Sequence, residues 1–170
     1  MYINQFDKSK QGGMAGSIAE TKFESLLLEK HLFFRRATLE EQYKHIDFVV
    51  LHPRTLKPNM VDVKSTKKVS RDEAITNSDI LWVEFVNVQG YPGWLYGCSD
   101  YVALYNQSEQ IFYIVSTKDL CNLCNNLCVN GYASGPYDAL YKLYTREGRK
   151  DVISMIKFSD LSNIPYTKFN

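Results

Sequence analysis

The sequence predicts a mixed α/β domain with a central β-sheet flanked by helices. Three observations lead to this fold class. An early segment, residues 16–31, has apolar residues at helical spacing, and several short runs rich in β-branched and aromatic residues follow it. A second helical segment, residues 116–131, then precedes one more strand-like run. The order helix, strands, helix, strand is typical of one sheet covered by helices.

Composition and charge limit the function classes. A chain of 170 residues is most simply one domain, and 45% hydrophobic with 23% charged residues is ordinary for a globular protein. The formal net charge of +1 excludes a strongly basic protein, so any nucleic-acid contact must come from a local patch. The chain has no apolar run of about 18 residues, so we expect no membrane-spanning helix and no membrane partner.

The N-terminal segment and the cysteines indicate the compartment. MYINQFDKSKQGG lacks the apolar stretch of a signal peptide, so we expect a cytoplasmic, reducing location with free thiols. Three cysteines of the second helical segment share one face with leucines, which predicts core packing in preference to metal binding. The four cysteines are Cys98, Cys121, Cys124 and Cys128.

The first half of the chain predicts an arm, a helix and a hairpin. Residues 1–15 are polar and glycine-containing and predict a flexible arm, which leaves 16–170 as a single domain. In the helix from residue 16, an apolar stripe is formed by Ala19, Phe23, Leu26 and Leu27. Strands over 46–51 and 60–63 are joined by HPRTLKPN, whose prolines and turn residues predict a hairpin.

The second half predicts further strands around one helix. Residues 80–88 form a long strand in which Leu81, Val83 and Phe85 face the core. Trp82, Glu84 and Val86 form the other face, which could be a nucleic-acid surface, although packing under a loop is favoured. QGYPG is a turn. Shorter strands are expected over 94–96, 101–105, 111–115 and 151–158. The helix between the last two is capped by Ser116 or Thr117 and ends at Gly131.

Two aspartates interrupt the apolar runs of the predicted hairpin. The loop centre near residue 55 places Asp47 across from residues 62–64, and cross-strand Cβ atoms lie only about 5 Å apart. Asp62 and Lys64 are two residues apart and therefore project from one face of their strand. The sequence thus predicts two carboxylates and one ammonium group together at one end of the sheet.

This arrangement predicts a divalent metal site. Two adjacent carboxylates repel each other, and a cation removes that conflict. Mg²⁺ or Mn²⁺ would bind the acids together with waters and substrate phosphate oxygens, and could activate a water for attack. Lys64 could orient or deprotonate that water, or stabilise the pentacovalent phosphate.

A third acid and two basic clusters flank this position. Glu20 borders the apolar stripe of the first helix, with Glu24 one turn later as the alternative. Basic residues that could grip backbone phosphates lie on both sides of the acids in sequence, although a solvated charge run is the other interpretation. These residues are Arg35, Arg36, Lys67, Lys68 and Arg71. A later pair, Arg146 and Arg149, could reach a phosphate, although a basic hairpin tip is the favoured interpretation.

Taken together, these residues resemble the motif of the PD-(D/E)XK nuclease superfamily. The matching residues are Glu20 on a helix with the lead-in GxxAExxFxxLL, then Asp47, then Asp62-Val63-Lys64. The chain departs from the pattern at Ile46, where proline is common, and at Asp62, where glutamate is commoner. The resemblance implies a restriction-endonuclease-like fold with an αβββαβ core. It also implies metal ligation by Asp47, Asp62 and the Val63 carbonyl, assistance by Glu20, and Lys64 as the catalytic lysine.

The resemblance also implies a function. We expect a metal-dependent nuclease that hydrolyses phosphodiester bonds, with DNA favoured over RNA. Because no Gln-xxx-Tyr motif follows Lys64, we expect a stand-alone Holliday-junction-resolvase-like or phage-type endonuclease, in which structure-specific cutting is one option. A homodimer would supply two sites for two strands. The alternatives are a catalytically inactive nucleic-acid-binding or assembly protein of the same fold, and a nuclease acting on RNA.

Overall fold

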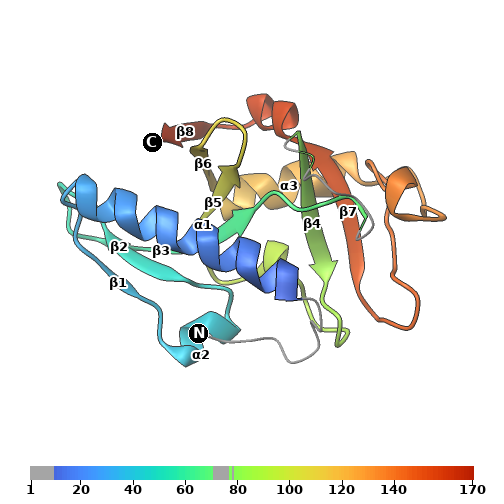
Figure 1. Cartoon of the computed structure of the whole chain (residues 1–170), viewed down its shortest axis with the longest axis horizontal. Helices are drawn as coiled ribbons and strands as arrows, with labels where there is room; N and C mark the ends of the chain where they lie inside the picture. Colours follow the sequence, from blue (N-terminus) through green and yellow to red (C-terminus); the bar gives the residue numbers. More distant parts are fainter. Residues whose placement is uncertain (1–9, 71–76, 78) are drawn as a thin grey trace.

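The central feature of the fold is a six-stranded mixed sheet with helices on its faces (Figure 1). The computed structural model describes residues 10–70, 77 and 79–170. In the central sheet the strand order is β1-β2-β3-β5-β6-β8, and β4 and β7 form a second, two-stranded sheet. The predicted fold class, a mixed central sheet flanked by helices, is confirmed.

The elements have the following bounds. The strands of the central sheet are β1 (Phe34–Arg36), β2 (Phe48–Leu51), β3 (Pro58–Ser65), β5 (Tyr101–Asn106), β6 (Ile111–Ser116) and β8 (Tyr166–Phe169). The second sheet contains β4 (Ile80–Val86) and β7 (Val152–Lys157). The α-helices are α1 (Lys10–Glu29), α2 (Leu39–Tyr43) and α3 (Thr117–Leu127). Three 3₁₀ helices are η1 (Trp94–Tyr96), η2 (Pro136–Asp138) and η3 (Phe158–Asn163).

The two halves of the central sheet meet at a parallel pair. β3 pairs with β5 in parallel, whereas β1–β2, β2–β3, β5–β6 and β6–β8 are antiparallel. A parallel pair needs a long crossover connection, and the described residues of this one include β4 and η1. The crossover therefore brings a second sheet beside the central one.

Helix α1 covers one face of the central sheet through its apolar stripe. Ala19, Phe23 and Leu27 are buried, as predicted, and the Phe23 ring packs edge-to-face on Phe48 and Phe112 at centroid distances of 5.4 and 5.2 Å. The helix begins at Lys10, so residues 10–15 of the expected flexible arm are helical. Residues 1–9 of that arm lie outside the described residues.

The opposite face of the sheet packs on α3 and on the β4–β7 sheet. Strand alternation divides β5 between the two cores, since Ala103 and Tyr105 face α1 while Val102 and Leu104 face the second core. In β4, the residues expected to face the core, Leu81, Val83 and Phe85, are all buried there. The predicted alternation of β4 is confirmed. The strand itself belongs to the smaller, two-stranded sheet and not to the central one.

Several predicted elements differ from the structure. The segment 94–96 is the 3₁₀ helix η1 and not a strand, because flanking Gly93 and Gly97 let the chain turn against neighbouring segments. Helix α3 is capped by Ser116, as expected, but ends at Leu127 before Gly131. Elements β1, α2 and β8 were not expected. They are short, and α2 depends on a capping box between Thr38 and Glu41.

The cysteines are free thiols in the structure. Cys124 and Cys128 are buried in the core behind the sheet, which confirms the packing prediction for them, whereas Cys121 is half-buried and Cys98 is exposed. Burial raises the pKa of the Cys124 thiol, so it stays protonated at neutral pH. Within the described part of the chain, no helix is both long and apolar enough to span a membrane.

The packing of α1 gives a stability prediction. Phe23→Ala should lower the free energy of unfolding by about 3–5 kcal/mol, because it empties an aromatic cluster that cannot collapse easily. Leu28→Ala in the same helix is the matched control. Leu28 is 62% exposed, so its truncation should change the free energy by about 0.5 kcal/mol or less. Urea unfolding followed by circular dichroism measures both, and similar losses for the two variants would contradict this core assignment.

Candidate active site

The β2–β3 hairpin positions the two aspartates predicted to act together. The antiparallel register pairs Phe48 with Val61, and the Asp47 N–H continues the ladder by donating to the Val61 carbonyl at 2.9 Å. The Asp47 carboxylate in turn accepts the Val63 N–H at 2.7 Å. Asp47 is thus held beside β3 on both its backbone and its side chain, as the hairpin prediction required.

Asp62 is the most unusual residue of the site. Only 1% of it is exposed. One carboxylate oxygen accepts from the Lys64 ammonium, while the other is buried without a hydrogen-bond partner among the described residues. Burial raises the pKa of Asp62 well above its ordinary value, and the nearby Asp47 raises it further against the opposing effect of Lys64. A charged Asp62 therefore needs more positive charge than Lys64 alone provides.

Lys64 is held as a cation between the acids. Its ammonium donates to Asp62 and to the Val63 carbonyl, the latter at 3.3 Å, and lies 5.7 Å from the centroid of the Trp94 ring. Burial lowers the pKa of Lys64, but the carboxylates of Asp62 and Asp47 outweigh it and the pKa is raised. A protonated lysine can donate hydrogen bonds but cannot accept a proton, so this environment favours an orienting or charge-stabilising role.

Helix α1 supplies the third acid. Glu20 lines the same cleft as Asp47 and Lys64, and burial together with the Asp47 carboxylate raises its pKa. Glu24, the alternative, instead pairs with Arg36, which lowers its pKa. Glu20 is therefore the helix acid that faces the site, although it also lies 3.5 Å from the Arg36 guanidinium.

These side chains line a cleft of about 300 Å³. Its walls come from α1, from the β2–β3 hairpin, and from the second sheet with its loops. The lining residues are Gly16, Glu20, His45, Asp47, Val63, Lys64, Ser65, Lys67, Glu84, Val88, Trp94, Arg146 and Arg149. The cleft brings together three of the four predicted catalytic residues, Glu20, Asp47 and Lys64. Asp62 does not line it but is buried and accepts a hydrogen bond from Lys64, which does.

Several lining residues were not predicted as site residues, among them Glu84, Trp94, Arg146 and Arg149. Glu84 was expected to pack under a loop, Trp94 to lie in a short strand, and Arg146 and Arg149 to form a hairpin tip. Burial raises the pKa of Glu84, while Lys67 and Lys64 lower it. Alternation in β4 did indicate that Glu84 leaves the core, but no sequence signal places that face against Lys64.

His45 lies at the edge of the cleft in a left-handed backbone conformation, with φ of 58°. Burial and the nearby Lys64 lower its pKa to about 4. The imidazole is therefore neutral near pH 7 and can accept a hydrogen bond or a proton.

The predicted basic clusters occupy different environments. Arg35 pairs with Glu41 and Arg36 with Glu24, so both guanidinium groups already have carboxylate partners. Lys67 lines the cleft, while the Lys68 carbonyl accepts the Trp82 indole N–H. Arg71 lies outside the described residues. Of these residues, Lys67 is the one that the structure places in the cleft.

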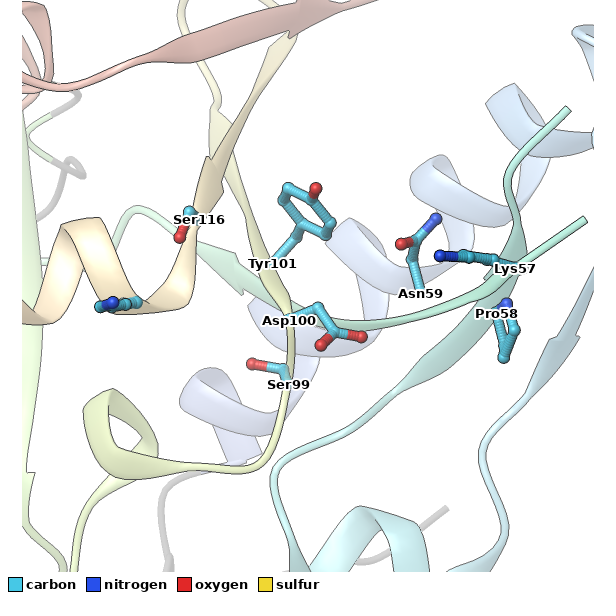
Figure 2. Close-up of a pocket in the computed structure, with 8 residues that line it drawn as sticks. Lys57, Pro58, Asn59, Ser99, Asp100, Tyr101 and Ser116 are labelled. Carbon is cyan, nitrogen blue, oxygen red and sulfur yellow. The ribbon is translucent and has the colours of Figure 1, made fainter. Parts of the chain in front are cut away.

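A second, larger concavity of about 430 Å³ lies near the start of β3 and β5 (Figure 2). Its polar groups already have structural roles, since Asp100 accepts the Met60 N–H at 2.8 Å and Ser99 bonds Thr117 at 3.0 Å. The described residues around it hold no cluster of acids comparable to the first cleft. The lining residues are Lys57, Pro58, Asn59, Ser99, Asp100, Tyr101, Ser116 and Lys118.

Comparisons with known proteins give one similar fold. No family model matches the sequence, and no curated protein is significantly similar to it. Among solved structures, a bacterial homing endonuclease, I-Ssp6803I, is similar at 15% sequence identity with a TM-score of 0.46. The similarity covers 65% of this chain and 72% of that one. The function is therefore inferred below from the residues of the cleft.

Close backbone contact at Gly93 gives a prediction for the site's architecture. A Cβ on Gly93 would lie 2.2 Å from the Glu84 carbonyl oxygen, so Gly93→Ala must push η1 and the Trp94 ring away from β4. We expect a loss of about 1–3 kcal/mol in the free energy of unfolding. Gly135→Ala is the control, because a Cβ there meets no heavy atom within 4 Å. Equal losses in urea unfolding would contradict the close approach.

Proposed function

We propose that the chain is a metal-dependent nuclease of the PD-(D/E)XK type that hydrolyses phosphodiester bonds, with DNA as the favoured substrate. The observation that carries this proposal is the buried Asp62 carboxylate beside Asp47 and Lys64, with one oxygen lacking a partner among the described residues. A structural ion pair alone leaves that oxygen unexplained, since a buried unpaired acceptor is costly.

The residues fit Mg²⁺ or Mn²⁺ as the proposed cofactor. Mg²⁺ is usually bound through one or two carboxylates, with waters and substrate phosphates completing its shell. Asp47, Asp62 and the Val63 carbonyl would hold it. Among the described residues, no group of three or more His, Cys, Asp and Glu side chains is close enough to hold a metal. Glu20, which lines the same cleft, would therefore assist through a water.

Each residue then has a defined task. When bound, the metal would lower the pKa of a coordinated water and offset charge on the phosphate. The Lys64 ammonium would donate to the phosphate oxygens as negative charge builds on them, or orient the attacking water. Neutral His45 could accept a proton from that water. The half-buried walls of the cleft would limit the access of other water molecules to the reacting phosphate.

Removing the central groups should abolish cutting. Asp62→Asn and Lys64→Ala should each lower the cleavage rate by about 10²–10⁴-fold, because they remove metal ligation and charge stabilisation. The assay incubates plasmid, single-stranded and four-way-junction DNA, and RNA, with Mg²⁺, Mn²⁺ or EDTA. Glu29→Gln in α1 and Lys57→Ala just before β3 are matched controls on the surface and should cut like the wild type. Preferred cutting of RNA would replace DNA as the substrate.

Metal binding can be tested without cleavage. Mg²⁺ or Mn²⁺ should raise the melting temperature of the wild-type protein, because a ligand that binds the folded state stabilises it. Asp62→Asn should remove that rise, whereas Glu29→Gln should keep it. An identical rise in all three proteins would place the metal elsewhere.

The main alternative is a non-catalytic nucleic-acid-binding or assembly protein of the same fold. This alternative would be supported if the protein cuts none of the tested substrates with either metal and still binds DNA in EDTA. The homodimer expected for cutting two strands stays a prediction, which sedimentation of the protein with and without DNA can test.

A further inference from the structure

The loop before β7 forms part of the wall of the cleft. Arg146 and Arg149 come from this loop and line the same cleft as Asp47 and Lys64. In sequence the loop reads as a basic turn far from the acids. The pairing of β7 with β4, whose Glu84 also lines the cleft, brings it to the site.

Three interactions give this loop a defined shape. The Arg146 guanidinium pairs with the carboxylate of Asp151, which is fully buried, and the Arg146 N–H donates to the same carboxylate at 3.3 Å. The Arg149 N–H donates to the Arg146 carbonyl at 3.0 Å. Gly148 has φ of 70°, a left-handed conformation that suits glycine. The position of Arg149 is therefore fixed before any ligand binds.

The turn after β4 supports the loop from its other side. A Cβ on Gly90 would lie 3.3 Å from the Lys150 side chain, so the two turns are in close contact. Val88 from the same turn lines the cleft. Figure 1 shows the turn after β4 and the loop before β7 extending to the same end of the second sheet.

Arg149 differs from the other arginines around the site in having no partner among the described residues. Arg35, Arg36 and Arg146 are each paired with a carboxylate. The Arg149 side chain is half-buried in the cleft and makes no hydrogen bond or ion pair with any residue that the structure describes. Its guanidinium thus presents N–H donors toward the space that a ligand would fill.

We infer that Arg149 binds a backbone phosphate of the nucleic-acid strand held in the cleft. This inference rests on the proposed function. A guanidinium fork matches two phosphate oxygens, and its partial burial strengthens the contact. Lys64 and Lys67 line the same cleft and add positive charge, so a phosphate is the anion that this wall suits.

Arg149 acts as a positioning residue and not a catalytic one. The metal-binding acids and Lys64 belong to the hairpin, whereas Arg149 comes from the loop of the second sheet. Its loss should weaken binding of the strand and leave the chemical step intact. That separates its effect from that of Lys64.

The binding experiment uses fluorescein-labelled duplex and single-stranded DNA in EDTA, with fluorescence anisotropy as the readout. Arg149→Gln should raise Kd about 10-fold. It should also reduce the slope of log K against log salt concentration by about one, the change expected when one phosphate contact is lost. Arg149→Lys should keep the slope and lose part of the affinity. Arg54→Gln removes the same charge from the exposed turn between β2 and β3 and should leave Kd nearly unchanged.

The cleavage experiment separates this inference from the proposed function. With saturating DNA, Arg149→Gln should raise KM and keep kcat, while Lys64→Ala should lower kcat. If Arg149→Gln binds DNA like the wild type with an unchanged salt slope, the inference is wrong even if the protein is a nuclease. Weakened binding by this variant of a protein that never cuts would support the phosphate contact and reject the nuclease. Absence of any nucleic-acid binding by the wild type would reject both.

Discussion

The burial of β3 on both faces is the constraint on which the site depends. Because side chains alternate along a strand, Val61 and Val63 pack beneath α1, and Asp62 and Lys64 must point to the opposite side. The parallel pairing with β5 keeps the strand interior, so Asp62 cannot reach solvent, while Lys64 reaches only the cleft. The sheet thus forces a carboxylate into a place where it needs a cation.

The residues around Asp62 supply only part of the positive charge that its buried carboxylate needs. Lys64 occupies one oxygen of Asp62 and packs over Trp94, whose position depends on the close approach of Gly93 to β4. The second oxygen of Asp62 has no partner among the described residues. This residual deficit of positive charge links the architecture to metal binding, because a divalent ion would stabilise Asp62 and Asp47 at once.

The cleft is assembled from parts with separate structural roles. Helix α1 provides an acid beside its packing stripe, the hairpin provides two aspartates and the lysine, and the loops of the second sheet provide two arginines. Rigid elements carry the acids, while a loop closed by the ion pair between Arg146 and the buried Asp151 carries Arg149. The proposed catalysis and the proposed binding of the nucleic-acid strand therefore depend on different segments of the protein. Mutations in one segment can test one of these roles without changing the other.

The sequence by itself determined the hairpin, the faces of α1 and β4, and the grouping of Asp47 with Asp62 and Lys64. Those features follow from spacing within one helix, strand or hairpin, where local geometry fixes which side chains are neighbours. Tertiary structure alone decided that 94–96 is a 3₁₀ helix and that Glu84, Trp94 and Arg149 reach the cleft. Their placement depends on how the β4–β7 sheet packs beside the central sheet, and contacts between segments far apart in the chain leave no periodic pattern in the sequence.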